Sequence, residues 1–299
     1  MKRCLSCHQL FDRRGWICPE CGNAPEERRG FPHFAPLLAD ENDQFVAEAF
    51  SRLAEVEPHS FWFRERNQNI LWALGRYFPD SSSVCELGCG TAFVLEALTR
   101  FLPDATFVGC EVFTEGLVEA GRRLEASTAT GLDERLSLLQ LDGRNLPFEE
   151  HFDLFCAFDV LEHIEEDEVV LGNAHRALRP RGGLLITVPQ HPFLWSHEDD
   201  YSGHQRRYRR KELVTKVEGA GFEVLRVSSF VSLLLPLLIA QRAWSRFSKP
   251  PEPGTYALRP AAPVNAVFGA TLKMERALLR LGGSWPAGGA RQRAPPPRG

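Results

Sequence analysis

The chain has 299 residues, of which 43% are hydrophobic and 25% charged, and its formal net charge at pH 7 is -4. This composition is typical of a globular protein with one large core and appended segments. The small negative charge argues against a global basic field that would attract nucleic acid. The N-terminus lacks the apolar stretch of a signal peptide, and no run reaches the ~18 apolar residues of a membrane span. We therefore expect a cytoplasmic protein.

The first 30 residues contain two closely spaced cysteine pairs. "CLSC" and "CPEC" supply Cys4, Cys7, Cys18 and Cys21. Two C-x-x-C pairs separated by ten residues are typical of paired zinc knuckles, and a segment this small needs the metal in order to fold. We predict a structural zinc ribbon over residues 1–30. The segment has six Arg or Lys and four Asp or Glu, and a zinc ion with four thiolates would cancel that excess, so nucleic-acid binding is not expected.

Helical periodicity dominates from residue 31 to 79, which we interpret as an N-terminal helical extension. Strands and helices then alternate, and several strands are almost entirely apolar, as when both faces of a parallel sheet are covered. The pattern predicts a doubly wound α/β domain over residues 80–230, whose ligands bind at the carboxyl ends of the strands. The predicted strands are 83–88, 105–110, 135–141, 152–158, 182–188 and 222–229; the predicted helices are 91–102, 115–127, 162–178 and 210–219.

A glycine-rich turn, "VCELGCGTAF", follows the first predicted strand. Such a turn lets the backbone approach a ligand closely. A dinucleotide fingerprint needs a third glycine where Phe93 stands, and a Walker loop needs a Gly-Lys-Ser/Thr sequence that is absent here. A metal site from Cys85 and Cys89 lacks two further ligands. We interpret these two residues, with Cys110 and Cys156, as small packing side chains.

"ELGCGT" resembles the first motif of class I S-adenosylmethionine-dependent methyltransferases of the small-molecule branch. "VGCEV", "LDG", "FDVLEHI" and "LRPRGGLLITVP" follow in the family's order. The resemblance covers residues 60 to 230 and implies a Rossmann-like methyltransferase sheet with S-adenosyl-L-methionine as cofactor. It implies contacts from Gly88 and Gly90, with Glu111 on the ribose and Asp142 on the adenine. It also implies that Glu86 and Asp159 face the methionine end, with helix-terminus and substrate roles as the respective alternatives.

The segment 188–213 after the fifth core strand predicts an acceptor-site lid. Methyl transfer to oxygen or nitrogen usually needs a base with a pKa near neutrality, and the loop offers His191, His197 and His204. His163 is a further candidate base, with a packing or capping role as the alternative. Trp195 and Tyr201 are candidate pocket residues. The basic run "HQRRYRRK" is either a clamp for an acceptor phosphate or carboxylate, or a solvated helix start.

Residues 231–299 read as a C-terminal extension. The apolar run that begins at Phe230 is too short to span a membrane, so residues 230–247 form either a helix lining the acceptor pocket or a helix lying in the membrane interface. A Pro-rich linker, an amphipathic helix over 264–281 and a disordered tail follow. No seventh strand is evident.

Two function classes remain open. One is a methyltransferase that acts on a small-molecule or lipid-linked acceptor, with possible peripheral membrane contact. The other is an RNA or protein methyltransferase that uses the zinc ribbon for docking. The balanced charge of the ribbon and the negative charge of the whole chain favour the first class.

Overall fold

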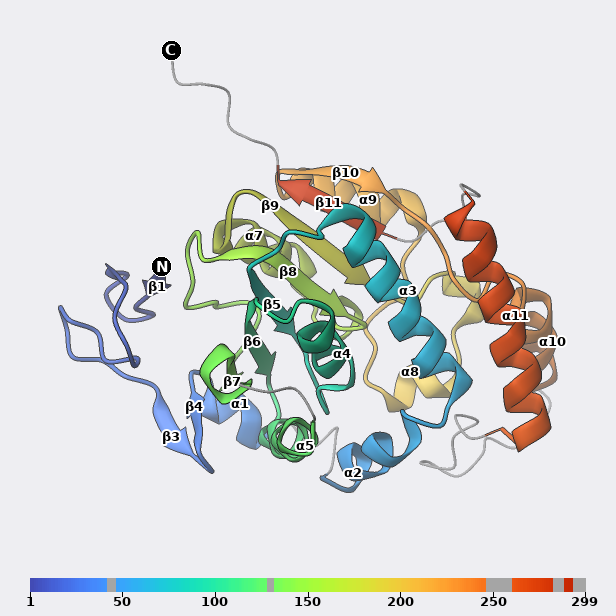
Figure 1. Cartoon of the computed structure of the whole chain (residues 1–299), viewed down its shortest axis with the longest axis horizontal. Helices are drawn as coiled ribbons and strands as arrows, with labels where there is room; N and C mark the ends of the chain where they lie inside the picture. Colours follow the sequence, from blue (N-terminus) through green and yellow to red (C-terminus); the bar gives the residue numbers. More distant parts are fainter. Residues whose placement is uncertain (42–46, 128–131, 246–259, 282–287, 293–299) are drawn as a thin grey trace, which may run out of the picture.

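A computed structural model describes residues 1–41, 47–127, 132–245, 260–281 and 288–292. Its centre is a sheet of nine strands in the order β10-β11-β9-β8-β5-β6-β7-β4-β3 (Figure 1). The five central strands are parallel and agree with the predicted ones; in spatial order they are β9 (Leu178–Thr187), β8 (Phe152–Phe158), β5 (Ser83–Leu87), β6 (Thr106–Glu111) and β7 (Leu136–Gln140). The alternation of apolar strands and helices thus produces the expected doubly wound α/β fold.

The two edges of the sheet differ from the sequence-based expectation. β11 (Gly288–Gln292) lies between β9 and β10 (Phe222–Arg226) and is antiparallel to both. A seventh core strand therefore exists, and the prediction of a disordered tail was wrong for these residues. At the other edge, β4 (Phe31–His33) runs parallel to β7 and forms a hairpin with β3 (Glu26–Arg28). The segment expected to be helical from residue 31 thus begins with a strand.

Helices cover both faces of the sheet. α7 (Asp167–Ala177) and α9 (Arg210–Gly219) supply buried residues to one hydrophobic cluster. α3 (Phe61–Tyr77), α4 (Phe93–Phe101) and α5 (Thr114–Glu125) supply the cluster on the other face. Shorter helices complete the described part: α1 (Pro36–Glu41), α2 (Ala47–Val56), α6 (Leu132–Arg135), α8 (His197–Tyr201) and the 3₁₀ turns η1 (Leu161–His163) and η2 (Pro192–Leu194).

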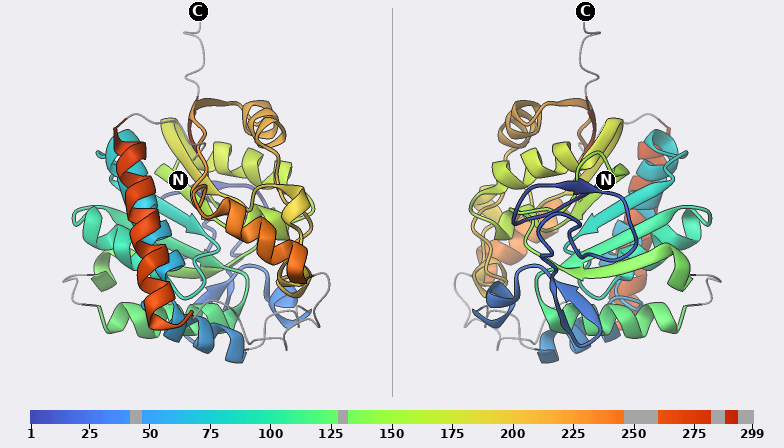
Figure 2. Two further views of the ribbon diagram at one scale, coloured as in Figure 1. Left: turned by 90° about the vertical axis from the view of Figure 1, so that its right-hand side faces the viewer. Right: turned by 90° about the vertical axis from the view of Figure 1, so that its left-hand side faces the viewer.

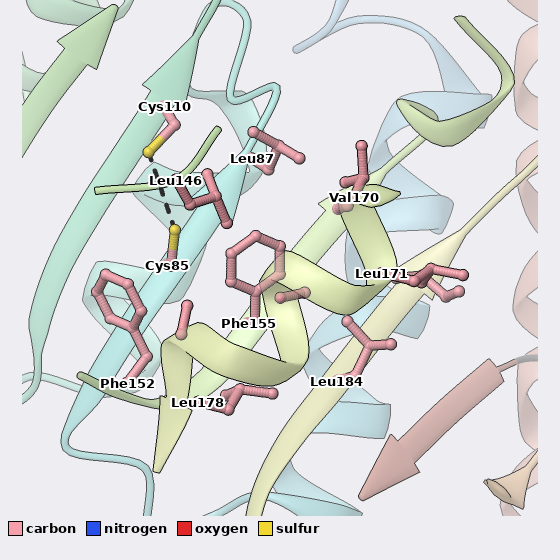
Figure 3. Packing of buried hydrophobic residues seen from close by; sticks show 14 of the residues in the cluster. Cys85, Leu87, Cys110, Leu146, Phe152, Phe155, Val170, Leu171, Leu178 and Leu184 are labelled. Atoms are coloured by element: carbon pink, nitrogen blue, oxygen red, sulfur yellow. Dashed lines mark hydrogen bonds between the residues drawn. The ribbon is translucent and has the colours of Figure 1, made fainter. Parts of the chain in front are cut away.

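The four cysteines outside the N-terminal segment belong to the core. Cys85 and Cys110, on neighbouring strands, face each other with their sulfurs 3.9 Å apart among leucine and phenylalanine side chains (Figure 3). Cys89 and Cys156 are buried in the cluster on the opposite face. Burial raises the pKa of Cys85, Cys89 and Cys156 well above the usual thiol value. Protonated thiols of this kind pack as small apolar groups, as predicted.

The N-terminal segment docks against one end of the sheet. Its hairpin consists of β1 (Lys2–Arg3) and β2 (Leu10–Phe11). The backbone N–H of Arg3 donates to the carbonyl of Pro147 at 2.9 Å. The Trp16 ring packs edge-on against Phe34 and Phe148. The right-hand view of Figure 2 shows this segment, in dark blue, on the side away from the C-terminal helices.

Two further helices, α10 (Leu235–Ser245) and α11 (Ala262–Arg280), follow β10 in the chain. α11 matches the predicted amphipathic helix and packs along α3, where Asn265 Oδ1 accepts a 2.8 Å hydrogen bond from the N–H of Phe61 (Figure 1). α10 precedes it in the chain, and the backbone N–H groups of Ser232 and Leu233, just before α10, donate to the Glu275 carboxylate of α11. Most of the predicted Pro-rich linker over residues 249–263 falls outside the described part, which omits residues 246–259. Among the described residues, no helix is both long and apolar enough to cross a membrane.

Candidate active site

The glycine turn lies where β5 ends and α4 begins. Gly88 and Gly90 have φ angles of +67° and +52°, in the left-handed region that favours glycine. A Cβ at Gly88 would lie 2.3 Å from Cγ2 of Val160, whereas a Cβ at Gly90 would meet no heavy atom within 4 Å. Gly88 is therefore required by packing, and the open side of Gly90 leaves room for a ligand beside the backbone.

Glu111 ends β6 next to this turn. Its carboxylate accepts hydrogen bonds from the N–H groups of Gly90 at 2.9 Å, Val112 at 2.8 Å and Phe113 at 3.2 Å. Burial raises its pKa, and the three backbone donors oppose that rise. The side chain is thereby fixed beside the open face of Gly90.

Glu86, Arg66 and Asp159 meet at the carboxyl ends of β5 and β8. Glu86 is buried, and its Oε2 has no hydrogen-bond partner among the described residues. Burial raises its pKa well above the usual value, and the charge of Arg66 opposes this. Arg66 forms an ion pair with Asp159, which also accepts a 3.0 Å hydrogen bond from the Thr187 hydroxyl. The predicted pair Glu86 and Asp159 thus lies close to a guanidinium.

Arg66 and Glu57 are site residues that the sequence reasoning missed. Glu57, just beyond α2, accepts hydrogen bonds from the Thr91 hydroxyl at 2.5 Å and from Arg123 at 2.6 Å, which fastens the glycine turn to α2 and α5. No motif marks Glu57. Arg66 carries a usable signal, since it occupies the helical stripe of Trp62 and Ile70, where an apolar residue is expected.

Asp142 follows β7, as predicted, and is half-buried. Its carboxylate accepts from the backbone N–H of Arg144 at 2.9 Å and pairs with the Arg144 side chain at the same distance. The side chain therefore stabilises its own turn, and Asp142 follows β7, the strand that pairs with β6 and Glu111 at the carboxyl edge of the sheet.

A cavity of about 740 Å³ opens beyond the carboxyl ends of β8 and β9. Its inner wall is polar and includes Asp159, Glu162, Thr187 and His204. Its outer wall is apolar and comes from η2, the start of α3, and α10 with the segment before it; the side chains include Trp62, Leu194, Phe230, Leu234, Leu235, Leu237 and Leu238. A ligand with a polar reacting end and an apolar body fits this division.

The four candidate histidines lie in different environments. His204 lines the cavity, and its Nδ1 lies 2.8 Å from Oδ1 of Asp199. His163 packs edge-on against it, with ring centroids 4.7 Å apart. His191 is on the cavity wall, where burial and then the charge of Arg207 lower its pKa. His197 is exposed, 3.9 Å from Asp200, and is not among the cavity residues.

The basic run is largely engaged within the protein. Arg206 pairs with Asp167 at 2.9 Å, and Arg207 pairs with Asp199 at 2.7 Å. Arg209 and Arg210 border the cavity. Only Arg209 and Arg210 therefore remain candidates for the clamp that the whole run was predicted to form. Trp195 and Tyr201, expected as pocket residues, are exposed and not among the cavity residues.

The four N-terminal cysteines come together as predicted. Their sulfurs all lie within 4.8 Å of one another, with Cys4 and Cys21 at 3.6 Å and Cys7 and Cys18 at 3.5 Å. Sulfurs bound tetrahedrally at the usual Zn–S distance of about 2.3 Å are roughly 3.8 Å apart, so the donor set fits zinc. The cluster is at the opposite end of the molecule from α10 and α11 (Figure 1).

The family model described as a methyltransferase domain matches residues 59–227, which is more than half of the chain. The five parallel strands and the glycine turn lie within this range. The residues that line the cavity lie within it or follow it in the chain. The chain therefore belongs to the methyltransferase-domain family, and the resemblance found in the sequence is confirmed.

Relatives of known name agree with this assignment. A demethylmenaquinone methyltransferase of Symbiobacterium thermophilum is 24% identical over 168 residues, 54% of this chain and 66% of the relative. A malonyl-[acyl-carrier protein] O-methyltransferase of Priestia megaterium is 22% identical over 112 residues, 38% of each chain. The chain thus spans less than two thirds of these relatives. The structure of a phosphoethanolamine N-methyltransferase of Haemonchus contortus shares the fold, with a TM-score of 0.54 and 16% identity over 89% of this chain and 62% of that one.

Proposed function

We propose that the protein transfers a methyl group from S-adenosyl-L-methionine to a small-molecule or lipid-linked acceptor. The observation that carries the proposal is the position of the cavity, which begins at Asp159 and Thr187, directly beside the glycine turn and Arg66. Methyl transfer needs the acceptor and the methyl donor aligned and close together, which adjacent sites provide.

The residues present fit the cofactor. The open side of Gly90 gives it space, Glu111 offers a fixed carboxylate to the ribose, and Glu86 has a buried oxygen without a partner. We assign Asp142 to the adenine, because it follows β7, the strand that pairs with β6 and its Glu111. Bound S-adenosylmethionine would supply a methyl group on a sulfonium, already activated for transfer.

The acceptor would lie with its reacting group at the polar wall near Asp159, Glu162 and His204. The apolar side chains of η2 and α10 would exclude water around its body. The names of the relatives, which describe methylation of demethylmenaquinone and of an acyl-carrier-protein-bound malonyl group, support a small or carrier-linked acceptor. The alternative, an RNA or protein substrate docked by the ribbon, gains no support because the ribbon lies at the opposite end of the molecule from α10, whose residues line the cavity.

The test uses methyl-labelled S-adenosylmethionine and an extract of the source cells, followed by separation into lipid, small-molecule, RNA and protein fractions. We expect label in the lipid or small-molecule fraction. Leu238→Arg, which places a charge in the apolar wall, should abolish labelling while calorimetry still detects cofactor binding. Leu225→Arg, at an exposed leucine outside the cavity, is the matched control. Label confined to RNA or protein would overturn the proposal.

A further inference from the structure

Three side chains converge on one point at the polar side of the cavity, and two of them, Glu162 and His204, line the cavity. Glu162, His163 and His204 each offer a ligand atom, and these atoms all lie within 4.8 Å of one another. Glu162 and His163 belong to η1, directly after β8, while His204 comes from the segment after α8. The fold brings two parts of the chain together here.

Glu162 has no partner of its own. Its side chain is fully buried, and neither carboxylate oxygen has a hydrogen-bond partner among the described residues. A buried carboxylate without a donor or a cation is costly, and most such groups in folded proteins are satisfied. A cation or a hydrogen-bond donor bound between Glu162, His163 and His204 would therefore stabilise this carboxylate.

His204 is oriented for ligation. Its Nδ1 lies 2.8 Å from Asp199, so its Nε2 is the nitrogen left for a ligand. Asp199 is buried and is itself held by two hydrogen bonds from Arg207, at 2.7 and 3.0 Å. A carboxylate that fixes one ring nitrogen while the other faces a metal is the usual arrangement around metal-bound histidines.

We propose that Glu162, His163 and His204 bind one divalent first-row transition ion, with Asp199 as the positioning residue of His204. Two imidazoles and one carboxylate suit Mn²⁺, Fe²⁺ or Zn²⁺, whereas Mg²⁺ and Ca²⁺ prefer oxygen ligands alone. Three protein ligands leave coordination positions open toward the cavity. A hydroxyl of the acceptor bound there would have a lowered pKa and would release its proton to water. This role rests on the proposed function, but the metal site itself does not.

Binding is measured with Mn²⁺ alone, by electron paramagnetic resonance, on the full chain with zinc already in the ribbon. Thiolates bind Mn²⁺ poorly, so the ribbon does not compete. We expect one Mn²⁺ per chain, abolished in Glu162→Gln and about 10–100-fold weaker in Asp199→Asn. His197→Ala removes an exposed histidine of the same loop and should leave Mn²⁺ binding unchanged.

Glu162→Gln preserves the shape of a fully buried side chain, and its thermal unfolding is recorded to confirm that it folds. His163→Ala is the second variant, since His163 is exposed and its removal is tolerated more easily. Absence of Mn²⁺ binding to the parent, or equal binding to both variants and the parent, would overturn the proposal. Cofactor binding and methyl transfer are measured separately, and neither outcome contradicts the proposed function.

Discussion

Alanine substitution at the two glycines of the turn should have different consequences, although both have left-handed backbones. Left-handed φ costs an alanine about 1–2 kcal/mol relative to glycine. At Gly88 the new methyl would also lie 2.3 Å from Cγ2 and 3.3 Å from Cγ1 of Val160, and overpacking of this kind costs roughly 1–3 kcal/mol. We expect Gly88→Ala to lower the free energy of unfolding by about 2–5 kcal/mol, and Gly90→Ala by about 1–2 kcal/mol.

Urea unfolding and cofactor calorimetry separate the two effects. Val160→Ala in the Gly88→Ala background removes the overlap but leaves the backbone strain, so it should restore only the packing share of the lost stability. Gly90→Ala should instead lose at least about tenfold in S-adenosylmethionine affinity, equivalent to ~1.4 kcal/mol, because its methyl occupies the open space where the cofactor passes.

Two results would refute this reasoning. If Gly90→Ala binds the cofactor as tightly as the parent, the space beside Gly90 is not cofactor space. If Val160→Ala gives Gly88→Ala no stability beyond its own effect on the parent, the packing against Val160 is not what requires glycine at this position.

Three further predictions concern the cofactor, the zinc and the acid stability. Glu111→Ala should weaken S-adenosylmethionine binding by about 10²–10⁴-fold in calorimetry, since two ribose hydrogen bonds to a charged group contribute ~1.5–3 kcal/mol each, and the exposed Glu125→Ala should not. Metal analysis should find one zinc per chain, and Cys4→Ser with Cys18→Ser should lose it while cofactor binding persists, because the sheet has its own core; zinc retained by this variant contradicts the ribbon. Burial, then the positive charges of the N-terminus, Arg179 and Lys2, lower the pKa of His151 to about 4. Unfolded histidine titrates near ~6.5, so the unfolded state alone takes up this proton as the pH falls from about 6.5 to 4, and stability declines over that window. In urea unfolding, His151→Gln should show a smaller decline than the parent, and an equal decline would exclude His151 as its source.

The centre of the fold was predictable because its strands are apolar on both faces, whereas the edges were not. β11 has the sequence "GGARQ", which lacks the apolar or β-branched residues that mark a strand. Its pairing depends on two flanking strands, of which β9 ends about a hundred residues earlier. β4 contains a proline, and only the hairpin with β3 and one bridge to β7 identify it. Long-range pairing of this kind leaves no local pattern.

The candidate site divides in the same way. Gly88, Gly90 and Glu111 follow strand ends at fixed spacings, so sequence alone placed them at one edge of the sheet. Partners that arrive from elsewhere in the chain were not predictable, as with Arg66 on Asp159 or Asp199 on His204. The basic run could be recognised in the sequence, but its ion pairs could not. Arg206 and Arg207 are neutralised by the buried Asp167 and Asp199, which lie elsewhere in the chain.

The position of α10 bears on the two alternatives for residues 230–247, a helix lining the acceptor pocket or a helix lying in the membrane interface. Leu235, Leu237 and Leu238 line the cavity, as expected of a pocket helix, whereas Ile239 is 43% exposed and is not among the cavity residues. A helix lying in the membrane interface would hold Arg242, Trp244 and Arg246 at headgroup level, and their side chains lie outside the described part. One side of the helix thus faces the cavity, and the exposed Ile239 is the described residue of α10 that supports the hypothesis of a membrane contact.

The membrane hypothesis predicts that Ile239, an exposed residue of α10 outside the cavity lining, takes part in the contact. We expect the protein to co-sediment with anionic vesicles, less so at high salt. Ile239→Glu should weaken this co-sedimentation while cofactor binding and thermal unfolding stay unchanged, since the side chain is neither buried nor among the cavity residues. Leu225→Glu, at an exposed leucine on β10, should remain bound. If the parent stays in the supernatant with anionic vesicles at low salt, α10 serves the cavity alone and the acceptor reaches it from water.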